Sequence, residues 1–312
     1  MATAAKKLAA SATPAFQVTG TYTGLKAPLT SGIVVLHDNT ITSYIATVPP
    51  AVSTDPIAES PLANPPVALC GDITNGVAIT DGTSVAYLTG VGVVGAKWNS
   101  LPDLPPPLQN PGDTESVAEL CGDLANGLIA YNSYNLFNLT FSSMPAPYEW
   151  YAMAALPGGT LTTIAGDPTN GVLLVMTPET DAGQPSGPSV LYYSLGCSCA
   201  WVPVTNSGPG LPVVKVQVDL ACGNGSGFVI YGENQLFTLS LKYAPATATA
   251  AASCVATSTT RPSPPFQVDD LSGDPINGCT AICASSGLIA TTTGTFASWT
   301  VINAVPPDQS QS

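Results

Sequence analysis

Basic residues are the scarcest chemical class in this sequence. Its 312 residues include seven Lys and Arg against 20 Asp and Glu, which gives a formal net charge of −13. A protein that binds the phosphates of nucleic acid needs clustered cations, and seven scattered ones do not supply them. The same shortage argues against an anionic membrane surface. We therefore expect neither nucleic acid nor membrane among the partners.

Long apolar runs are also missing. No run reaches the roughly 20 residues of a membrane span. The apolar stretch Leu8–Ala10 is too short for the hydrophobic core of a signal peptide, because Pro14 follows soon after it. We interpret residues 1–15 as an N-terminal tail and residues 308–312 as a C-terminal tail.

The residue types that usually build catalytic sites are few. His37 is the only histidine and Arg261 the only arginine. His37 and Asp38 are adjacent at the end of a predicted strand, where successive side chains point to opposite faces, so they cannot act as an oriented pair. A nucleophile also needs a base within hydrogen-bond reach. Since no such pair is evident, we predict that the chain is not an enzyme and has no catalytic residue and no cofactor.

A six-residue pattern, Gly-Asp-x-x-Asn-Gly, recurs along the chain. It occurs at Gly71–Gly76, Gly122–Gly127, Gly166–Gly171 and Gly273–Gly278, and a shortened relative spans Gly223–Gly227. The first glycines of successive copies are 51, 44, 57 and 50 residues apart. Near-even spacing of this kind indicates an internal structural repeat.

Each copy of the hexapeptide lies in the same local context. A short run that ends in a small residue precedes it, and an apolar run, a turn and a third run follow. A fourth run carries a tryptophan, at Trp98, Trp150, Trp201 or Trp299. Gly (29) and Pro (30) fall between the runs, as in proteins made of short strands joined by tight turns. Four strands in about 50 residues are the unit of a propeller blade.

We therefore predict an all-β fold, a β-propeller of six four-stranded blades that occupies residues 16–307. A degenerate first copy supplies the sixth blade, because Phe16–Val18 has the same sequence as Phe266–Val268. Five blades with an N-terminal appendage are the alternative. The expected blades are approximately 16–66, 67–116, 117–160, 161–215, 216–265 and 266–307.

The repeat loosely resembles the Asp-box blades of sialidases. Sialidases bind the substrate carboxylate with three arginines, whereas this chain has Arg261 alone. Its turns read Gly-Asp-x-x-Asn-Gly instead of Ser-x-Asp-x-Gly-x-Thr-Trp. The resemblance thus implies a propeller architecture, of the kind found in virion-associated or lectin-like modules, without sialidase activity.

The Asp and Asn of each hexapeptide are interpreted as structural turn residues. Asp accepts hydrogen bonds from backbone N–H groups two residues on, and Asn-Gly readily takes the positive φ of a tight turn. These residues are Asp72, Asn75, Asp123, Asn126, Asp167, Asn170, Asp274 and Asn277. A ring of cation-binding loops is the alternative, but Ca²⁺ needs six or more oxygens. We predict no metal site.

The tryptophans have two interpretations. Packing of a large aromatic side chain between blades is the simpler one. In the other, Trp98, Trp150, Trp201 and Trp299 each form the floor of a sugar pocket by stacking on the ligand. A repeated sugar pocket should place the same polar residue beside each tryptophan. The residues that follow them, Asn99, Tyr151, Val202 and Thr300, share no such chemistry, which favours packing.

The eight cysteines do not have the paired Cys-x-x-Cys spacing of a structural zinc site. Cys70, Cys121 and Cys222 occupy one repeated position, which Ala165 and Ser272 fill elsewhere. Because this position selects small volume, we interpret the three as packing thiols.

Three further cysteines, Cys197, Cys199 and Cys254, lie in the outer, irregular parts of adjacent repeats. We hypothesise one disulfide that joins Cys254 to either of the other two.

These observations favour a non-catalytic structural or attachment protein of an extracellular assembly. Few Lys and Arg among many Thr, Ser, Ala, Gly and Pro resemble the surfaces of virion proteins. We expect a decoration, fibre or tail-associated component of a tailed-phage virion, held by other chains through residues 1–15. The alternative is a lectin-like propeller that binds a glycan. A glycoside hydrolase, which needs only two carboxylates, is a third and less favoured hypothesis.

Overall fold

The computed structural model describes residues 17–19, 32–37, 40–45, 51–56, 60–91, 93, 95–108, 119–140, 148–179, 187–196, 200–206, 213–225, 227–283 and 288–304. Within these ranges the chain consists of strands β1 to β24 and one short 3-10 helix, η2 (Pro106–Leu108). None of the helical structure in these ranges is long and apolar enough to cross a membrane. The predicted tails, residues 1–15 and 308–312, lie outside the described residues.

Successive sets of four strands form antiparallel meanders. The first three sets are β1 (Gln17–Thr19), β2 (Gly32–His37), β3 (Thr40–Ile45) and β4 (Ala51–Pro56); β5 (Ala68–Asp72), β6 (Gly76–Thr80), β7 (Val85–Leu88) and β8 (Trp98–Ser100); and β9 (Glu119–Asp123), β10 (Gly127–Tyr131), β11 (Leu136–Leu139) and β12 (Tyr151–Ala152). The later sets are β13 (Thr160–Asp167), β14 (Gly171–Thr177), β15 (Val190–Ser194) and β16 (Val202–Asn206); β17 (Leu220–Asn224), β18 (Gly227–Gly232), β19 (Gln235–Ala244) and β20 (Ser253–Arg261); and β21 (Asp270–Asp274), β22 (Gly278–Cys283), β23 (Leu288–Thr293) and β24 (Thr300–Ala304).

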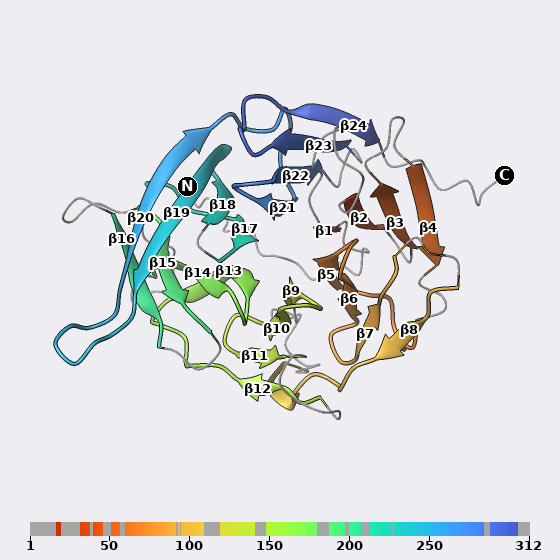
Figure 1. The fold of residues 1–312 in the computed structure, drawn as a ribbon, viewed down its shortest axis with the longest axis horizontal. Coiled ribbons are helices and arrows are strands. Elements are labelled where there is room, and N and C mark those ends of the chain that lie inside the picture. Colours follow the sequence, from red (N-terminus) through yellow and green to blue (C-terminus); the bar gives the residue numbers. More distant parts are fainter. Residues whose placement is uncertain are drawn as a thin grey trace, which may run out of the picture.

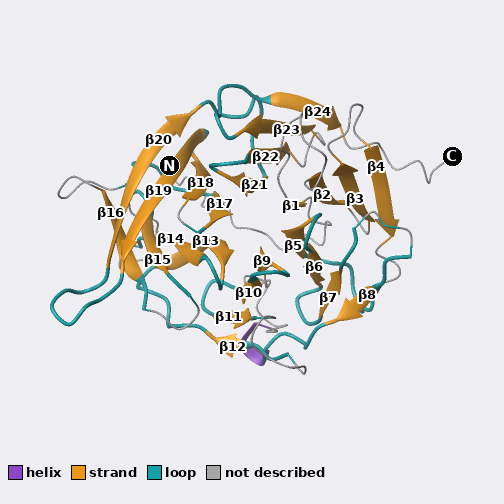
Figure 2. Cartoon of the chain, viewed as in Figure 1, coloured by secondary structure: helices purple, strands orange, loops and turns teal. Residues whose placement is uncertain are grey.

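The meanders stand side by side around a central axis, with the first strand of each innermost and the fourth outermost (Figure 1). Nearly all of the described chain is strand or loop (Figure 2). The fold is a β-propeller, and the predicted all-β class is confirmed. The inner strands β5, β9, β13 and β21 each end on the Asp of a hexapeptide, so the short run that precedes each full hexapeptide in the sequence is the innermost strand of its meander.

Two meanders are joined into one sheet. Four sheets have four strands, but the eight-stranded order β13-β14-β15-β16-β20-β19-β18-β17 connects two meanders at their outer strands. The connection is a parallel pairing of β16 with β20, in register at Val204 with Cys254. The long hairpin β19–β20 therefore lies along the rim of the ring (Figure 1). Since the sheets number five, the count of six blades and their expected boundaries stay predictions.

The core lies between neighbouring meanders. The second strands are buried over their whole length in β6, β10 and β22, because each packs against a neighbouring meander on both faces. Their continuous apolar and β-branched sequences, such as Gly-Val-Ala-Ile-Thr in β6, suit a strand without a solvent-facing side. Ile41, Val77 and Leu88 belong to one such buried cluster.

The glycines of the hexapeptide are required by the turn. Gly71 and Gly76 have φ values of +100° and +105°, which side chains other than glycine rarely adopt. A Cβ atom on Gly71 would also lie 2.3 Å from the carbonyl oxygen of Gly76. The two ends of the turn therefore approach each other more closely than a side chain allows.

Neighbouring hexapeptide turns touch one another around the ring. The Thr169 hydroxyl donates to the carbonyl oxygen of Asn126, 2.6 Å away in the preceding turn. A Cβ atom on Gly127 would lie 3.0 Å from the Pro168 side chain. The turns consequently lie on one face of the propeller, which we call the hexapeptide face.

Candidate functional site

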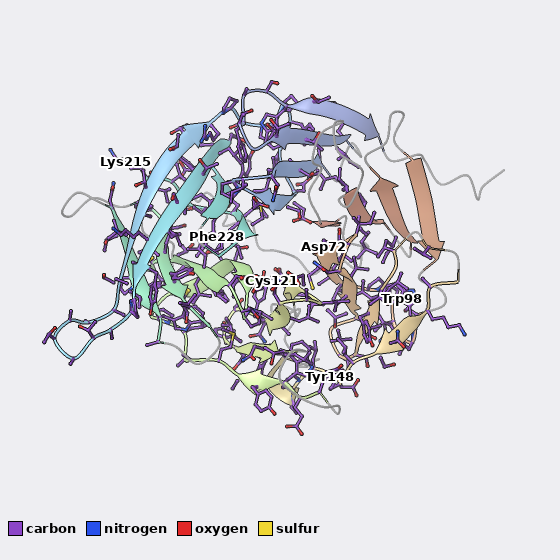
Figure 3. The ribbon with its side chains drawn as sticks, in the orientation of Figure 1. Asp72, Trp98, Cys121, Tyr148, Lys215 and Phe228 are labelled. Atoms are coloured by element: carbon purple, nitrogen blue, oxygen red, sulfur yellow. The ribbon has the colours of Figure 1, made fainter. Side chains whose placement is uncertain are left out.

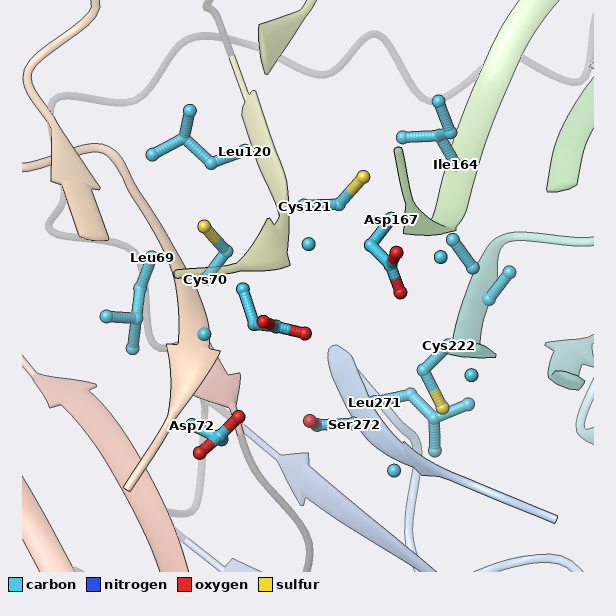
Figure 4. Close-up of a pocket in the computed structure, with 18 of the residues that line it drawn as sticks. Leu69, Cys70, Asp72, Leu120, Cys121, Ile164, Asp167, Cys222, Leu271 and Ser272 are labelled. Carbon is cyan, nitrogen blue, oxygen red and sulfur yellow. The ribbon is translucent and has the colours of Figure 1, made fainter. Parts of the chain in front are cut away.

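A cavity of about 600 Å³ lies on the axis of the ring. Its walls are the inner strands β5, β9, β13, β17 and β21, and the side chains of these strands surround it in Figure 4. In the close-up, the carboxylates of Asp72 and Asp167 lie beside the cavity, and the thiols of Cys70, Cys121 and Cys222 lie along its wall, between neighbouring inner strands. The cavity is thus the place where the repeat brings its titratable side chains together.

The ionisable charge of this cavity is acidic. Its carboxylate-bearing residues are Asp72, Glu119, Asp123, Asp167, Asp270 and Asp274. Among the described residues that line it there is no Lys, Arg or His. A cleft lined by charges of one sign concentrates counter-charged ligands, so the cavity favours cationic groups.

The Asp carboxylates of the turns are held by their own hexapeptides. Oδ1 of Asp72 accepts the backbone N–H groups of Thr74 and Asn75, each at 2.7 Å. Oδ2 of Asp72 accepts the side-chain amide of Asn75 at 2.9 Å. The same three contacts recur at Asp123 with Asn126, Asp167 with Asn170 and Asp274 with Asn277. All eight turn residues singled out in the sequence therefore lie in one repeated hydrogen-bonded arrangement.

Burial changes the proton affinity of two acids at the cavity. Burial raises the pKa of Asp167, and the hydrogen bonds from Asn170 and Thr169 oppose the rise only in part. The surrounding protein likewise raises the pKa of Glu119, although the Tyr131 hydroxyl donates to its Oε2 at 2.6 Å. Although protein surrounds the Glu119 carboxylate, part of the side chain is exposed and lines the cavity. Sequence reasoning did not identify this Glu119–Tyr131 pair, which has no repeated counterpart in the motif.

The thiols of the cavity are poor nucleophiles. Burial raises the pKa of Cys70, Cys121 and Cys222 well above the usual range of a thiol, and nearby acidic groups raise it further. Because the thiolate is the reactive form of cysteine, these side chains are protonated and react slowly near neutral pH.

The tryptophans lie at junctions between meanders, far from the axis; Trp98 marks one of these positions in Figure 3. All four are half-buried. The indole N–H of Trp150 donates to the carbonyl oxygen of Pro102 at 3.0 Å, that of Trp201 to Ala154 at 3.1 Å, and that of Trp299 to Pro262 at 2.8 Å. In each case the acceptor follows the outer strand of the preceding meander. The indoles thus join adjacent meanders.

The structure contains a second, smaller pocket that the sequence did not predict. It has a volume of about 220 Å³ and lies between the β5–β8 and β9–β12 meanders. Its lining residues are Asn75, Tyr87, Thr89, Leu124, Ala125 and Tyr148. Tyr148 is visible close to this junction in Figure 3. Because these residues are scattered over more than one repeat, no local motif could have indicated the pocket.

The remaining candidate residues are only partly described. Cys254 carries a free, buried thiol in β20, and its proposed disulfide partners Cys197 and Cys199 lie outside the described residues. His37 is the last residue of β2. Among the described residues, no group of three or more His, Cys, Asp or Glu side chains is placed to hold a metal ion.

Comparison with known proteins shows the fold. No protein-family model matches the chain, and no curated protein matches it either. Among solved structures, the chain is similar to PorZ, a surface component of the type IX secretion system of Porphyromonas gingivalis, with 11% identity and a TM-score of 0.51 over 94% of this chain. It spans 38% of the length of PorZ.

A chain of a nidogen/laminin complex matches with 9% identity and a TM-score of 0.51, over 84% of this chain and 89% of that one. A streptogramin B lyase matches with 13% identity and a TM-score of 0.45, over 92% of this chain and 86% of the lyase. At these identities the likeness concerns the β-propeller architecture alone.

Proposed function

We propose that this chain is a non-catalytic attachment protein that holds a partner chain at its hexapeptide face. The observation that carries the proposal is the state of the groups in the axial cavity. The turn carboxylates accept hydrogen bonds from their own hexapeptides, and burial keeps the thiols protonated. Groups held in this way stabilise the ring and do not form the nucleophile–base pair that covalent or acid–base catalysis requires.

The partner proposed for this face presents basic groups. The chain carries a net charge of −13, and the acidic cavity opens among the hexapeptide turns. Lys or Arg side chains of a partner would gain favourable electrostatic energy at the mouth of the cavity. The proposed setting, from the composition of the chain, is a virion or a similar extracellular assembly, with residues 1–15 as a second contact.

Titration with an oligolysine peptide at low and at high salt tests the proposal. We expect binding that weakens with salt and that falls several-fold in the variant Glu119→Gln/Asp270→Asn, which removes two cavity charges. Asp103→Asn is the matched control, because Asp103 is an exposed acid outside the cavity. Equal effects of the cavity and control variants would contradict the proposed site. Turnover of a glycan or ester substrate that the cavity variant abolishes would overturn the non-catalytic function.

A carbohydrate-binding function is the second candidate, and the small pocket between the β5–β8 and β9–β12 meanders supports it. Tyr87 and Tyr148 are half-buried there beside the polar residues Asn75 and Thr89. Aromatic faces with a few polar groups are the usual lining of small-molecule sites. A glycan array would test this candidate, with loss of the signal in Tyr148→Ala as the expected result. A signal that is lost in Trp150→Ala and kept in Tyr148→Ala would instead support the interpretation that the tryptophans stack on a sugar.

A further inference from the structure

The repeat places the same two positions against each other at successive junctions. The first is the small residue that precedes the opening glycine of a hexapeptide, on an inner strand. The second is the residue that follows the closing glycine in the next meander, on a second strand. The pairs that share a buried cluster in this way are Cys70 with Leu128, Cys121 with Val172, Ala165 with Phe228, and Cys222 with Cys279.

At one junction both positions are cysteine. Sγ of Cys222 in β17 lies 4.0 Å from Sγ of Cys279 in β22. Both thiols are free and buried, with 9% of Cys222 and none of Cys279 exposed. The sulfur atoms are about 2 Å farther apart than in a disulfide, a gap that side-chain rotation with a small strand shift can close.

The two thiols differ in access to the axis. Cys222 lines the axial cavity of about 600 Å³, whereas Cys279 does not. An oxidant as small as hydrogen peroxide that enters the cavity therefore meets Cys222 before Cys279. At the other cysteine-bearing junctions the facing residues, Leu128 and Val172, offer no second thiol.

We propose that Cys222 and Cys279 are a peroxide-dependent modification site, at which oxidation closes a disulfide between β17 and β22. The Cys222 thiolate attacks one oxygen of the peroxide, the O–O bond breaks, and hydroxide leaves with the thiol proton as water. This leaves a sulfenic acid on Cys222. The Cys279 sulfur then attacks the Cys222 sulfur, and the sulfenic oxygen leaves as a second water with the Cys279 proton. Two thiols lose two electrons, and one peroxide is reduced to two waters.

The cross-link adds a covalent bond between two meanders that already share packing contacts and the hydrogen bond from Trp299 to Pro262. It connects residues 57 positions apart in the chain, so it limits the freedom of the unfolded chain. We expect the disulfide to raise Tm by on the order of 5 °C. Because burial and the neighbouring Asp270 and Asp274 raise the pKa of Cys222, the reaction is expected to be slow at neutral pH and faster as pH rises.

The experiment treats the full-length, reduced protein with hydrogen peroxide, then blocks remaining thiols in denaturant and maps peptides without reduction. We expect one cross-linked peptide pair that contains Cys222 and Cys279, a higher Tm, and reversal of both by dithiothreitol. Valine is the natural residue at the equivalent position of another junction, Val172. Cys279→Val should therefore lose the cross-link and the Tm increase together. Cys121→Ser, which changes a cavity thiol without a thiol partner, should keep both.

A gain-of-function variant provides a second, independent readout. Leu128→Cys faces Cys70 in the same relationship at another junction, and peroxide should then produce a second cross-link, between residues 70 and 128. Recovery of Cys222 as a sulfinic acid or free thiol with Cys279 unmodified would overturn the proposal. A cross-link from Cys222 to any other cysteine in the folded protein would overturn it as well.

Discussion

Trp150 donates its indole N–H to the carbonyl oxygen of Pro102, 3.0 Å away and 48 residues earlier in the chain. The contact joins the β9–β12 meander to the residues that follow β8. The Trp201 and Trp299 indoles make the corresponding contact at two other junctions. The tryptophans at this repeated position thus stabilise the ring by binding backbone groups that are far from them in the sequence.

Trp150→Phe should lower the free energy of unfolding by about 1 kcal/mol, because the ring still packs but the hydrogen bond is lost. Trp150→Ala should cost more, since it also removes buried aromatic area. Urea unfolding followed by circular dichroism measures both. Unchanged stability in Trp150→Phe, with loss of binding to a glycan, would contradict the packing role.

Asp274→Ala should destabilise the protein more than Asp72→Ala. Asp274 is 6% exposed, whereas Asp72 lies in a more open turn. Removal of the acceptor leaves the donors of Ile276 and Asn277 unpaired at the buried site. We expect a loss of about 1 kcal/mol for Asp72→Ala and up to about 3 kcal/mol for Asp274→Ala, measured by urea unfolding. Calorimetric titration with Ca²⁺ is the control, and tight binding that either variant abolishes would contradict the structural role.

Gly122→Ala and Gly82→Ala separate two causes of glycine preference. Both glycines have positive φ, +92° and +88°. A Cβ atom at Gly122 would lie 2.3 Å from the carbonyl oxygen of Gly127, whereas none of the described atoms lies within 4 Å of a Cβ at Gly82. Gly82→Ala should therefore cost about 1 kcal/mol for its backbone conformation, and Gly122→Ala several times more. Similar midpoints of thermal unfolding for the two variants would show that the close approach is not a constraint.

Tyr193→Phe should weaken the dependence of stability on alkaline pH. The Tyr193 hydroxyl donates to the carbonyl oxygens of Asn170 and Gly225 in neighbouring turns, and burial raises the pKa of Tyr193 from 10.0 to about 12. The unfolded chain releases this proton first, so the contribution of Tyr193 is complete below pH 10.0 and is lost as pH rises toward about 12.

Urea midpoints measured from about pH 8 to about pH 11.5 should accordingly fall less steeply in Tyr193→Phe than in the unchanged protein. Tyr134→Phe is the matched control, because the Tyr134 side chain is 69% exposed and should leave the slope unchanged. Equal slopes for the protein and both variants would show that Tyr193 does not contribute to the alkaline loss of stability.

The repeat made much of the fold predictable. The apolar run that follows each full hexapeptide is the second strand of its meander, β6, β10, β14 or β22, as the sequence predicts. The turn bonds of Asp72 could be predicted because donor and acceptor are two or three residues apart. The acidic cavity could have been found from the same motif, since an Asp at the end of each inner strand must lie near the axis once the strands form a ring.

What the sequence by itself determined is local: the strand pattern, the glycine-dependent turns and their repetition along the chain. These depend on φ preferences and on hydrogen bonds between near neighbours. The tertiary structure alone decided the parallel pairing of β16 with β20, the bond from Trp150 to Pro102 and the approach of Cys222 to Cys279. Each of these contacts joins two segments that are about 50 residues apart in the chain. Their geometry depends on how each twisted meander packs against the next, and no single stretch of sequence specifies that packing.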